Sequence, residues 1–387
     1  MLEMVKAMGR LGTESAFEVL ARADELASQG RDIINLGIGQ PDFKTPEHIV
    51  EAAVKALRDG EHGYTPANGI LRCREAVAAY IYDNSGVNVD PGQVIIVPGG
   101  KVTMFFAILM FGGAGTEIIY PNPGFPIYES AINFSGAKAV PMSLHEKNSF
   151  SFSADEVLGL INSNTRLLII NSPANPTGGY VLREEVNKLV LGLEKFPQVA
   201  VLSDEIYSQM LYGGRQHVSL IEYESLRDRL ILLDGWSKTY AMTGWRIGYG
   251  IWPKTLVEPA TRLSINCHSC VNASTQLAGI AALEGPQNSV TDMLRAFDER
   301  RRSIMSQLNA IPGFSCVEPV GAFYAFPNIL QTGISAKELQ DHLLSEAGVA
   351  TIAGGSFGDR GEGYLRFSYA NSLDKITEAI NRIRRCL

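Results

Sequence analysis

Leu230-Ile231-Leu232-Leu233 is a short apolar run, and Lys238 follows it after four intervening residues. A run this short that is apolar on both faces predicts a strand buried within a mostly parallel sheet. Burial disfavours the charged form of a lysine, so we expect the amine of Lys238 to be nucleophilic. The alternative is an ordinary surface lysine, and only the rest of the chain can decide between the two.

The run at 230–233 belongs to a longer alternation of apolar runs and turn-forming clusters. The other runs are residues 94–97, 117–120, 167–170, 199–202 and 246–250. Helical patterns between several of them, such as residues 183–195, would supply the crossovers of a parallel sheet. Together these patterns predict an α/β fold.

The C-terminal part of the chain shows a different pattern. Its expected elements are a helix at 288–308 that stops before Pro312, a strand at 321–326, a helix from Ser335, a strand at 364–369 and a helix capped by Asn371 or Ser372. This mixture predicts a smaller α+β unit.

The bulk composition excludes several classes of function. The chain has 387 residues, is 45% hydrophobic and carries a formal net charge of −7. It shows no basic stripe of the kind that binds nucleic acid. No apolar run is long enough to span a bilayer, and the N-terminus lacks the pattern of a signal peptide. We therefore expect no nucleic-acid partner and no membrane partner.

The five cysteines are few, odd in number and scattered. This usage is typical of a reducing compartment, so we expect a cytoplasmic protein. Cys267-His268-Ser269-Cys270 has the C-x-x-C spacing, but the chain offers no second ligand pair for a zinc ion. We expect no metal site here and interpret these thiols as buried.

Polar residues gather where the expected strands end. They are Lys101, Asn175, Asp204, Tyr207 and Lys238. In open α/β sheets, ligands bind beyond the carboxyl ends of the strands. Structural polar residues would have no reason to share one edge of the sheet, so this coincidence predicts a ligand site there.

The residue types at this edge indicate a cofactor that carries both a phosphate and a carbonyl. Arg246, eight positions after Lys238, has a fork suited to a phosphate. Gly100 and Lys101 precede an apolar helical run, whose N-terminal N–H groups could hold the same phosphate. A nucleophilic amine beside an anion clamp favours pyridoxal 5'-phosphate.

Asp204 and Asn175 each have a second, structural interpretation. Asp204 could pair with a pyridinium nitrogen and so make the ring an electron sink, or it could cap a helix starting at Glu205. Asn175 could donate to a phenolate oxygen, or it could be a turn residue before Pro176. Tyr207 lies one helical turn beyond Asp204, so both side chains can face one ligand.

Taken together, these motifs resemble those of the fold-type I, class I aminotransferases that use pyridoxal phosphate, and most closely the bacterial aspartate-aminotransferase-like subgroup. The resemblance covers nearly the whole chain, and the joint order of the motifs is specific. The motifs are residues 36–43, 63–69, 175–178, 204–207, 237–246, 354–358 and 365–368. The resemblance implies a large domain at 47–287 with a mostly parallel seven-stranded sheet between helices. It also implies a small domain formed by 1–46 and 288–387.

The resemblance implies a role for each residue around the cofactor. Lys238 would bond the cofactor as a Schiff base and then move the proton. Asp204 would pair with the pyridinium nitrogen, while Tyr207 and Asn175 would bond the phenolic oxygen. The remaining cofactor-binding residues would be Gly100, Lys101, Ser237 and Arg246 at the phosphate and Phe125 against the ring.

The resemblance also implies a substrate site and a second subunit. Arg366 would bind the α-carboxylate of the substrate, close to Gly39 and Asn175. Tyr64 would reach the phosphate bound by the neighbouring subunit, so the active unit would be a homodimer.

Two departures from the family pattern lie near the cofactor. Phe125 stands where a Trp or Tyr is usual, and it can stack on a ring but cannot donate a hydrogen bond. Asp234-Gly235-Trp236 replaces the common Asn-Gly-Val, and the sequence gives no account of Trp236.

Two further features bear on the substrate. The helix after Lys101 lacks the lysine that some members of the subgroup carry there, and Phe17 lies in a segment that closes over the substrate in the family. We therefore expect a ping-pong aminotransferase that moves the amine of a neutral or aromatic amino acid, rather than strictly of aspartate, to a 2-oxo acid. The alternatives are a lyase, decarboxylase or oxidase on the same scaffold and, more remotely, a non-catalytic regulator.

Overall fold

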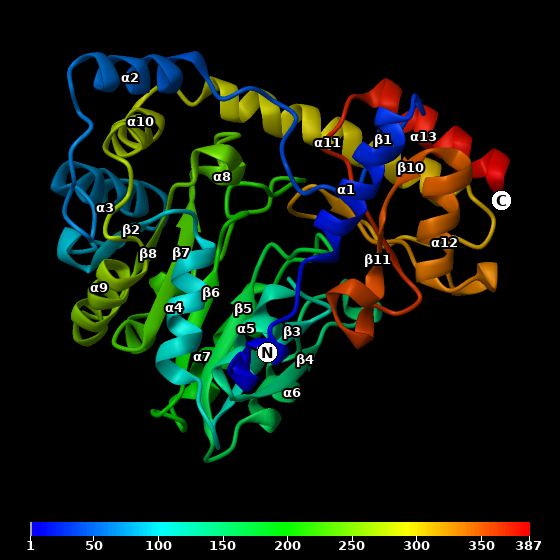
Figure 1. The fold of residues 1–387 in the computed structure, drawn as a ribbon. Helices are drawn as coiled ribbons and strands as arrows, with labels where there is room; N and C mark the ends of the chain where they lie inside the picture. The colour runs from blue at the N-terminus through cyan, green and yellow to red at the C-terminus, as the bar shows by residue number, and fades with distance from the viewer. Residues whose placement is uncertain (1) are drawn as a thin grey trace.

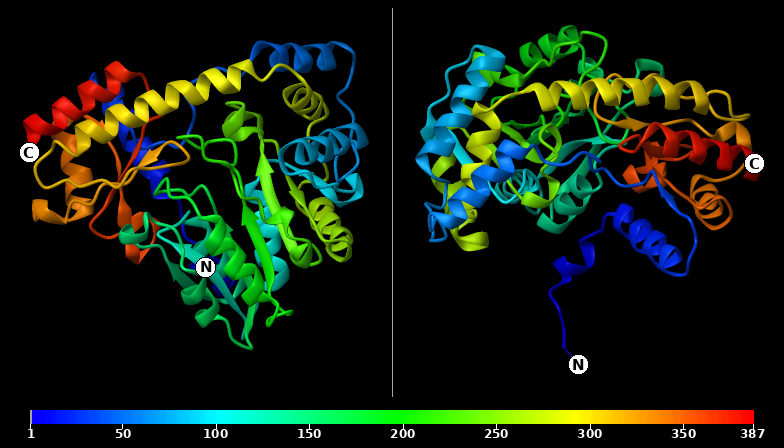
Figure 2. Two further views of the ribbon diagram at one scale, coloured as in Figure 1. Left: turned by 180° about the vertical axis from the view of Figure 1, so that it is seen from behind. Right: turned by 90° about the horizontal axis from the view of Figure 1, so that it is seen from above.

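The computed structural model describes residues 2–387, which form two lobes joined by long connections (Figure 1). Met1, the first residue of the predicted small domain, lies outside the described residues. Seen from above, the N-terminal residues project away from the body of the molecule (Figure 2).

The larger lobe is built on a seven-stranded sheet with the order β2-β8-β7-β6-β5-β3-β4. Its strands are β2 (Val94–Val97), β3 (Glu117–Asn122), β4 (Lys138–Ser143), β5 (Thr165–Asn171), β6 (Ala200–Asp204), β7 (Leu230–Gly235) and β8 (Gly248–Ile251). Neighbouring strands are parallel except for the two pairs that β8 makes. The predicted α/β fold with a mostly parallel sheet is confirmed.

Both faces of this sheet are buried, because alternate side chains of each strand pack on different helices. Ile231 and Leu233 join one apolar cluster with α4, α5 and α9, whereas Leu230 and Leu232 join another with α3, α6, α7 and α10. These helices are α3 (Leu71–Ser85), α4 (Lys101–Phe111), α5 (Ile127–Ser135), α6 (Ala154–Leu160), α7 (Arg183–Leu193), α9 (Lys254–His268) and α10 (Ala273–Glu284). A further helix, α2 (Glu47–Arg58), packs on α10. Two-sided burial explains why the strands are continuous apolar runs.

The smaller lobe combines short strands with helices, of which α11, α12 and α13 surround a second apolar core. Strands β1 (Ile34–Asn35) and β10 (Val349–Ala350) pair in parallel, and β11 (Ile352–Ala353), β12 (Leu365–Ser368) and β9 (Tyr324–Ala325) form an antiparallel sheet in that order. The helices are α1 (Ser15–Ser28), α11 (Asn288–Leu308), α12 (Ala336–His342) and α13 (Leu373–Cys386). Helix α11 reaches from one lobe to the other (Figure 1).

Several predictions of local structure in this lobe are confirmed. The helix expected at 288–308 is α11. The side chains of Ser335 and Ser372 accept hydrogen bonds from the backbone of Glu338 and Lys375, so these serines cap α12 and α13 as expected.

Other predicted boundaries were wrong, and the backbone gives the reasons. The strand expected at 246–250 begins only at Gly248, because Arg246 has a left-handed φ of 55°. The strand expected at 321–326 is limited to Tyr324–Ala325, because Ala322 has a φ of 54°. Strand β4 was missed because this edge strand is half-exposed and contains Pro141, so it lacks an apolar run.

Two further predictions concern the residues after Asp204 and the cysteines at 267 and 270. The helix considered as a start at Glu205 does not form, and a turn at 206–209 follows β6 instead. Cys267 is exposed and Cys270 half-buried, so the interpretation of both as buried thiols was wrong for Cys267, which lies in the solvent-facing last turn of α9. Across residues 2–387, no helix is long and apolar enough to cross a membrane.

Candidate active site

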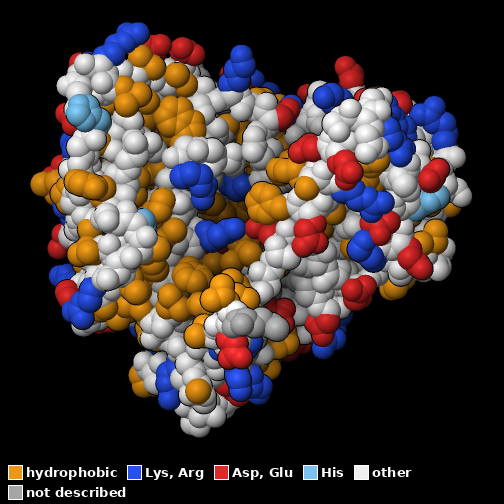
Figure 3. All heavy atoms as spheres, viewed as in Figure 1, with side chains coloured by type: hydrophobic (Ala, Val, Ile, Leu, Met, Phe, Trp, Pro, Cys, Tyr) orange, Lys and Arg blue, Asp and Glu red, His pale blue; other side chains and the backbone are white. Residues whose placement is uncertain are grey.

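A cavity of 470 Å³ lies at the carboxyl ends of the parallel strands, where the smaller lobe faces the sheet. Figure 3 shows this side of the molecule hollowed, with Lys and Arg side chains gathered in the hollow beside apolar ones. All the predicted site residues except Tyr64 line the cavity, namely Gly39, Gly100, Lys101, Phe125, Asn175, Asp204, Tyr207, Ser237, Lys238, Arg246 and Arg366.

Lys238 projects into the cavity from α8 (Trp236–Thr239), the short helix that follows β7. Its ammonium nitrogen donates to the carbonyl oxygen of Gly39 at 2.6 Å. Burial, followed by the positive charge of Arg366, lowers the pKa of Lys238 to about 8. A lysine in this state reaches its neutral, nucleophilic form within the physiological pH range.

Asp204 ends β6 and is buried beneath the cavity. Its Oδ2 accepts a hydrogen bond from the hydroxyl of Tyr128 at 2.6 Å, and its Oδ1 accepts one from the Ile206 amide at 3.3 Å. Burial raises the pKa of Asp204 to about 6, although the Tyr128 bond lowers it. A buried carboxylate with few partners is suited to pair with a cationic ring nitrogen.

Arg366, on β12, also lines the cavity and is buried. Its Nη1 donates to Oδ1 of Asn175 at 3.0 Å, and its Nη2 donates to the carbonyl oxygen of Gly37. Its Nε is buried without a partner. The guanidinium carbon lies 4.7 Å from the ring centres of both Tyr324 and Phe357. A buried guanidinium with an unsatisfied donor is suited to a carboxylate.

The phosphate end of the predicted site is a shallow cradle between two glycines and an arginine. Gly99 has a φ of 94°, and a Cβ there would lie 2.2 Å from Nη2 of Arg246. The Arg246 Nη1 donates to the Thr243 carbonyl oxygen at 2.7 Å. Gly100 precedes the first turn of α4, where free N–H groups attract anions.

The side chain of Lys101 does not join this cradle. It lies 3.1 Å from the carboxylate of Glu14 and 5.1 Å from the ring centre of Phe125. The predicted stacking residue, Phe125, also makes an edge-to-face contact with Tyr128. The ring of Phe125 and the ion pair of Lys101 with Glu14 therefore line the cavity side by side.

Tyr64 is 95% exposed and does not reach the cavity of its own chain. Such exposure of a large aromatic side chain fits the prediction that it serves a neighbouring subunit, but the single chain leaves that role a prediction.

Several residues of the cavity were not predicted as site residues, among them Glu14, Tyr128, Asn171 and Tyr324. Asn171 supports the site from β5, since its Nδ2 donates to the Asp204 carbonyl oxygen at 3.0 Å and its Oδ1 accepts from the Asn175 amide at 3.1 Å. Asn171 does end an apolar run, which was a usable signal. Tyr128 and Tyr324 lie far from their partners in the chain and gave none.

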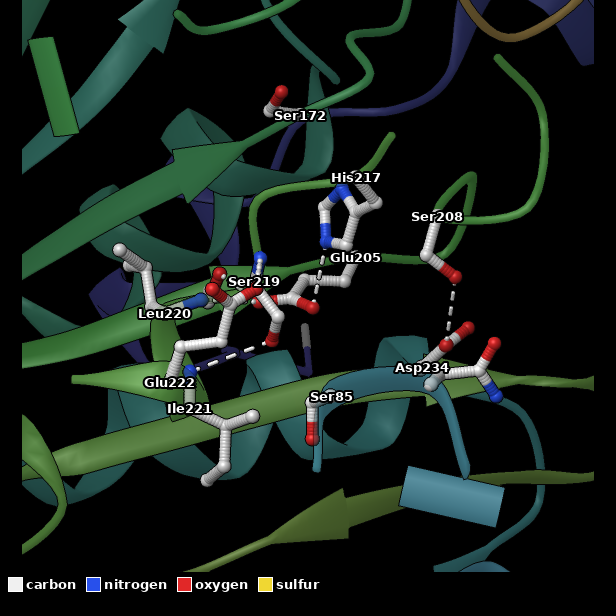
Figure 4. A network of polar contacts seen from close by, with 12 residues as sticks. Ser85, Ser172, Glu205, Ser208, His217, Ser219, Leu220, Ile221, Glu222 and Asp234 are labelled. Atoms are coloured by element: carbon white, nitrogen blue, oxygen red, sulfur yellow. Dashed lines mark hydrogen bonds and ion pairs between the residues drawn. The ribbon is translucent and has the colours of Figure 1, made fainter. Parts of the chain in front are cut away.

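A second polar network lies on the opposite face of β6 and β7 (Figure 4). His217 and Glu205 form a buried pair at 2.8 Å. Burial lowers the pKa of His217, but the carboxylate of Glu205 outweighs this and raises it. Ser208 donates to Asp234 at 3.1 Å, and the Gly235 amide donates to the same carboxyl at 2.7 Å.

Trp236, which the sequence left unexplained, is a packing residue beneath the lysine. It is fully buried, its Nε1 donates to the Gly279 carbonyl oxygen at 2.9 Å, and its ring meets Tyr249 edge to face. It fixes the start of the turn that carries Lys238.

These residues fit pyridoxal phosphate. Gly99 lets the Arg246 guanidinium pack against the backbone just before α4, the Arg366 Nε lacks a partner, and a buried carboxylate lines the same cavity as a lysine amine. Among residues 2–387, no group of three or more His, Cys, Asp or Glu is arranged to hold a metal ion.

Comparisons with known proteins show the family of the chain. The model of the family described as "Aminotransferase class I and II" matches residues 31–383. Aspartate aminotransferase of Pyrococcus horikoshii is 39% identical over 365 residues, or 94% of this chain and 93% of that protein. Aromatic-amino-acid aminotransferase 2 of Thermococcus litoralis is 37% identical over 94% of each chain. The structure of Thermus thermophilus aspartate aminotransferase with maleate has a TM-score of 0.95 at 31% identity, over 100% of both chains.

The sheet and its lysine-bearing edge define a pyridoxal-phosphate-dependent transferase of fold type I. The chain belongs to the class I and II aminotransferase family. It is an aminotransferase whose substrates are amino acids and 2-oxo acids.

Proposed function

We propose that Lys238 is the residue that bonds the cofactor and carries the proton during amine transfer. The observation that carries this proposal is the position of its amine, which faces one cavity together with Asp204 and Arg366. The bound cofactor supplies an electron sink, which no side chain offers. With a pKa of about 8, Lys238 can both hold and release a proton near neutral pH.

The other residues would bind and orient. Asp204 would hold the ring nitrogen, and Tyr207 and Asn175 the phenolic oxygen. Phe125 would stack on the ring, while Gly100, the Lys101 backbone, Ser237 and Arg246 would hold the phosphate. Arg366, with Asn175 and the Gly39 backbone nearby, would fix the α-carboxylate and so place the α-carbon beside the Lys238 amine.

The test is a Lys238→Ala variant measured in the presence of the cofactor. The visible absorbance of the bound cofactor and the half-reaction with amino donors should both be lost. A variant that kept both would contradict the role of Lys238. Single-turnover assays also separate the alternatives, since a lyase would release ammonia and pyruvate from a cysteine-like donor.

A neutral or aromatic amino donor is supported by the cavity wall. Phe17, Ile38 and Met104 all line the cavity beside the residues proposed to bind the substrate. Aromatic and aliphatic walls favour side chains that bury apolar surface. Steady-state assays with aromatic, branched, alanine and aspartate donors, each with pyruvate or 2-oxoglutarate, test this preference.

One observation favours acidic donors as a second candidate. The ammonium of Lys101 lies at the cavity with a single carboxylate partner, Glu14, so an incoming side-chain carboxylate would find a cation. A kcat/KM for aspartate above that for every neutral donor would support this candidate and contradict the first.

A cytoplasmic homodimer is the assembly we propose, with Tyr64 contributed across the interface. The dimer is supported by Tyr64, which is 95% exposed and does not line the cavity of its own chain, and the cytoplasmic location is supported by the scattered free cysteines. We also propose that the chain divides into a domain at 47–287 and a domain formed by 1–46 and 288–387, and this division is supported by the two lobes. Mixing two inactive variants, Lys238→Ala and Tyr64→Ala, should restore activity through hybrid dimers; no restoration would contradict the shared site.

A further inference from the structure

The side chain of Tyr324 joins three parts of the active site that no prediction connected. Its hydroxyl lies 2.8 Å from the hydroxyl of Tyr207. Its ring centre is 4.7 Å from the Arg366 guanidinium. A Cβ added at Gly39 would lie 2.3 Å from the same hydroxyl, so Tyr324 also packs directly on the backbone that accepts from Lys238.

Tyr324 and Tyr207 come from different lobes. Tyr324 lies on β9, where it pairs with Ser368 of β12, the strand that also carries Arg366. Tyr207 lies in the turn after β6 of the larger lobe. Their hydrogen bond is therefore a link between the sheet that presents the carboxylate clamp and the sheet edge that would hold the cofactor.

The direction of this hydrogen bond decides what Tyr207 can do. Both phenols are buried, and burial raises the pKa of each above its ordinary value, so both keep their protons at neutral pH. Within residues 2–387, the Tyr324 hydroxyl has no other hydrogen-bond partner. If Tyr324 donates to Tyr207, the Tyr207 proton is free to be donated to a ligand oxygen.

We propose that Tyr324 is a positioning residue with two tasks. Its hydroxyl donates to Tyr207, so that Tyr207 donates to the cofactor's phenolic oxygen. Its ring keeps Arg366 aligned for the substrate carboxylate. This inference rests on the roles proposed above for Tyr207, Lys238 and Arg366. The two tasks can be tested separately, because Tyr324→Phe removes only the hydroxyl, whereas Tyr324→Leu removes both the hydroxyl and the ring.

Tyr324→Phe tests the hydroxyl. A hydrogen bond to the phenolic oxygen stabilises its negative charge, so weaker donation by Tyr207 should favour the protonated cofactor. The pH midpoint of the cofactor's visible absorbance should rise by about half a pH unit or more. Affinity for a monocarboxylate inhibitor should change less than about twofold, because the ring over Arg366 remains.

Tyr324→Leu tests the ring. Without the Tyr324 ring, the guanidinium keeps the Phe357 face but loses the other, so the dissociation constant of the same inhibitor should rise about three- to tenfold. The matched control is Tyr369→Phe, which removes another buried hydroxyl of the smaller lobe, one that donates to the Ala322 carbonyl oxygen at 3.1 Å and does not line the cavity. Its midpoint and inhibitor affinity should equal those of the unchanged protein.

The outcomes separate this inference from the proposed function. If the visible absorbance depends on Lys238 but Tyr324→Phe leaves its midpoint unchanged, the role of the Tyr324 hydroxyl is overturned and the role of Lys238 stands. Equal shifts in Tyr324→Phe and Tyr369→Phe would also overturn it, because the effect would then be a general one on packing. Absorbance that survives Lys238→Ala would instead overturn the proposed function.

Discussion

The amine of Lys238 donates to the carbonyl oxygen of Gly39 at 2.6 Å, so a lysine of the larger lobe is held by the backbone of the segment at 36–43. The same glycine leaves room for Tyr324, since a Cβ there would lie 2.3 Å from the Tyr324 hydroxyl. Gly39→Ala should therefore displace both the carbonyl and Tyr324. We expect kcat/KM to fall about tenfold to a hundredfold, measured under steady-state conditions.

Gly159→Ala, in α6 away from the cavity, is the control for this substitution. A Cβ at Gly159 would meet nothing within 4 Å, and its backbone is not left-handed. Its activity should stay within about twofold of the unchanged protein. Equal losses in the two variants would show that the close approach at Gly39 is unimportant.

The strands that carry the site were predictable because burial on two faces leaves a strong sequence signal. Residues 94–97 and 230–233 are apolar throughout, and Lys101 and Lys238, each four or five positions after one of these runs, line the cavity. Strand β4 gave no such signal, since an edge strand does not need two apolar faces.

The contacts within the site were less predictable, because they depend on residues brought together from distant parts of the chain. Tyr128 reaches Asp204 from 76 positions away, and Tyr324 reaches Tyr207 from 117 positions away. Trp236 is explained only by the Gly279 carbonyl oxygen, which belongs to another helix. Tyr64 was predicted from the family resemblance alone, and in this chain it is exposed and does not line the cavity.

Tyr128→Phe should weaken cofactor binding in a pH-dependent way. The Tyr128 hydroxyl donates to Asp204 and lowers the pKa of that carboxyl, which burial has raised to about 6. Without the bond the pKa rises further, so fewer molecules carry the carboxylate at pH 6 than at pH 8. The dissociation constant of pyridoxal phosphate should therefore rise about three- to tenfold at pH 6 and less at pH 8.

Equilibrium titration of the apoenzyme at the two pH values measures this effect. Tyr369→Phe again serves as the control, because its hydroxyl bonds a backbone carbonyl rather than a carboxylate. A loss of affinity that is the same at both pH values would contradict the link to Asp204.

Asp234→Asn should change how stability depends on pH. Burial raises the pKa of Asp234 from an ordinary value of 3.8 to about 7, with the nearby Glu205 raising it further and the Gly235 amide, Ser208 and His217 lowering it. The folded state therefore binds more protons than the unfolded chain between about pH 4 and pH 7, and stability falls as pH rises through that window. Asparagine keeps the acceptor for Gly235 but cannot ionise.

The unfolding free energy of the variant, relative to the unchanged protein, should increase with pH across this window. One proton gives a slope of at most about 1.4 kcal/mol per pH unit. Urea unfolding of the two apoproteins at pH 5 and pH 8 measures the difference, with Asp374→Asn as an exposed control. A difference that does not vary with pH would show that Asp234 does not titrate in the folded state.

Arg300 and Asp42 tie the segment at 36–43 to helix α11. The Arg300 Nη1 and Nη2 lie 2.6 and 3.0 Å from the two carboxylate oxygens of Asp42, and its guanidinium packs 4.8 Å from the ring centre of Phe43. Only 11% of the Arg300 side chain is exposed. This segment supplies the carbonyl oxygens that hold Lys238 and Arg366, at Gly39 and Gly37.

Arg300→Met should lower the unfolding free energy by about 1–3 kcal/mol, because it leaves the Asp42 carboxylate without its partner in a half-buried place. It should also raise the KM for amino donors more than it lowers kcat, since the segment at 36–43 positions the carboxylate clamp. Asp42→Asn combined with Arg300→Met should lower the unfolding free energy by less than the sum of the two single changes.

The exposed ion pair of Arg262 and Glu258 is the control, because its side chains are 68% and 70% exposed. Arg262→Met should lower the unfolding free energy by less than about 0.5 kcal/mol and leave KM unchanged. Additive costs for Asp42 and Arg300, with an unchanged KM, would contradict a role for this pair in holding the site.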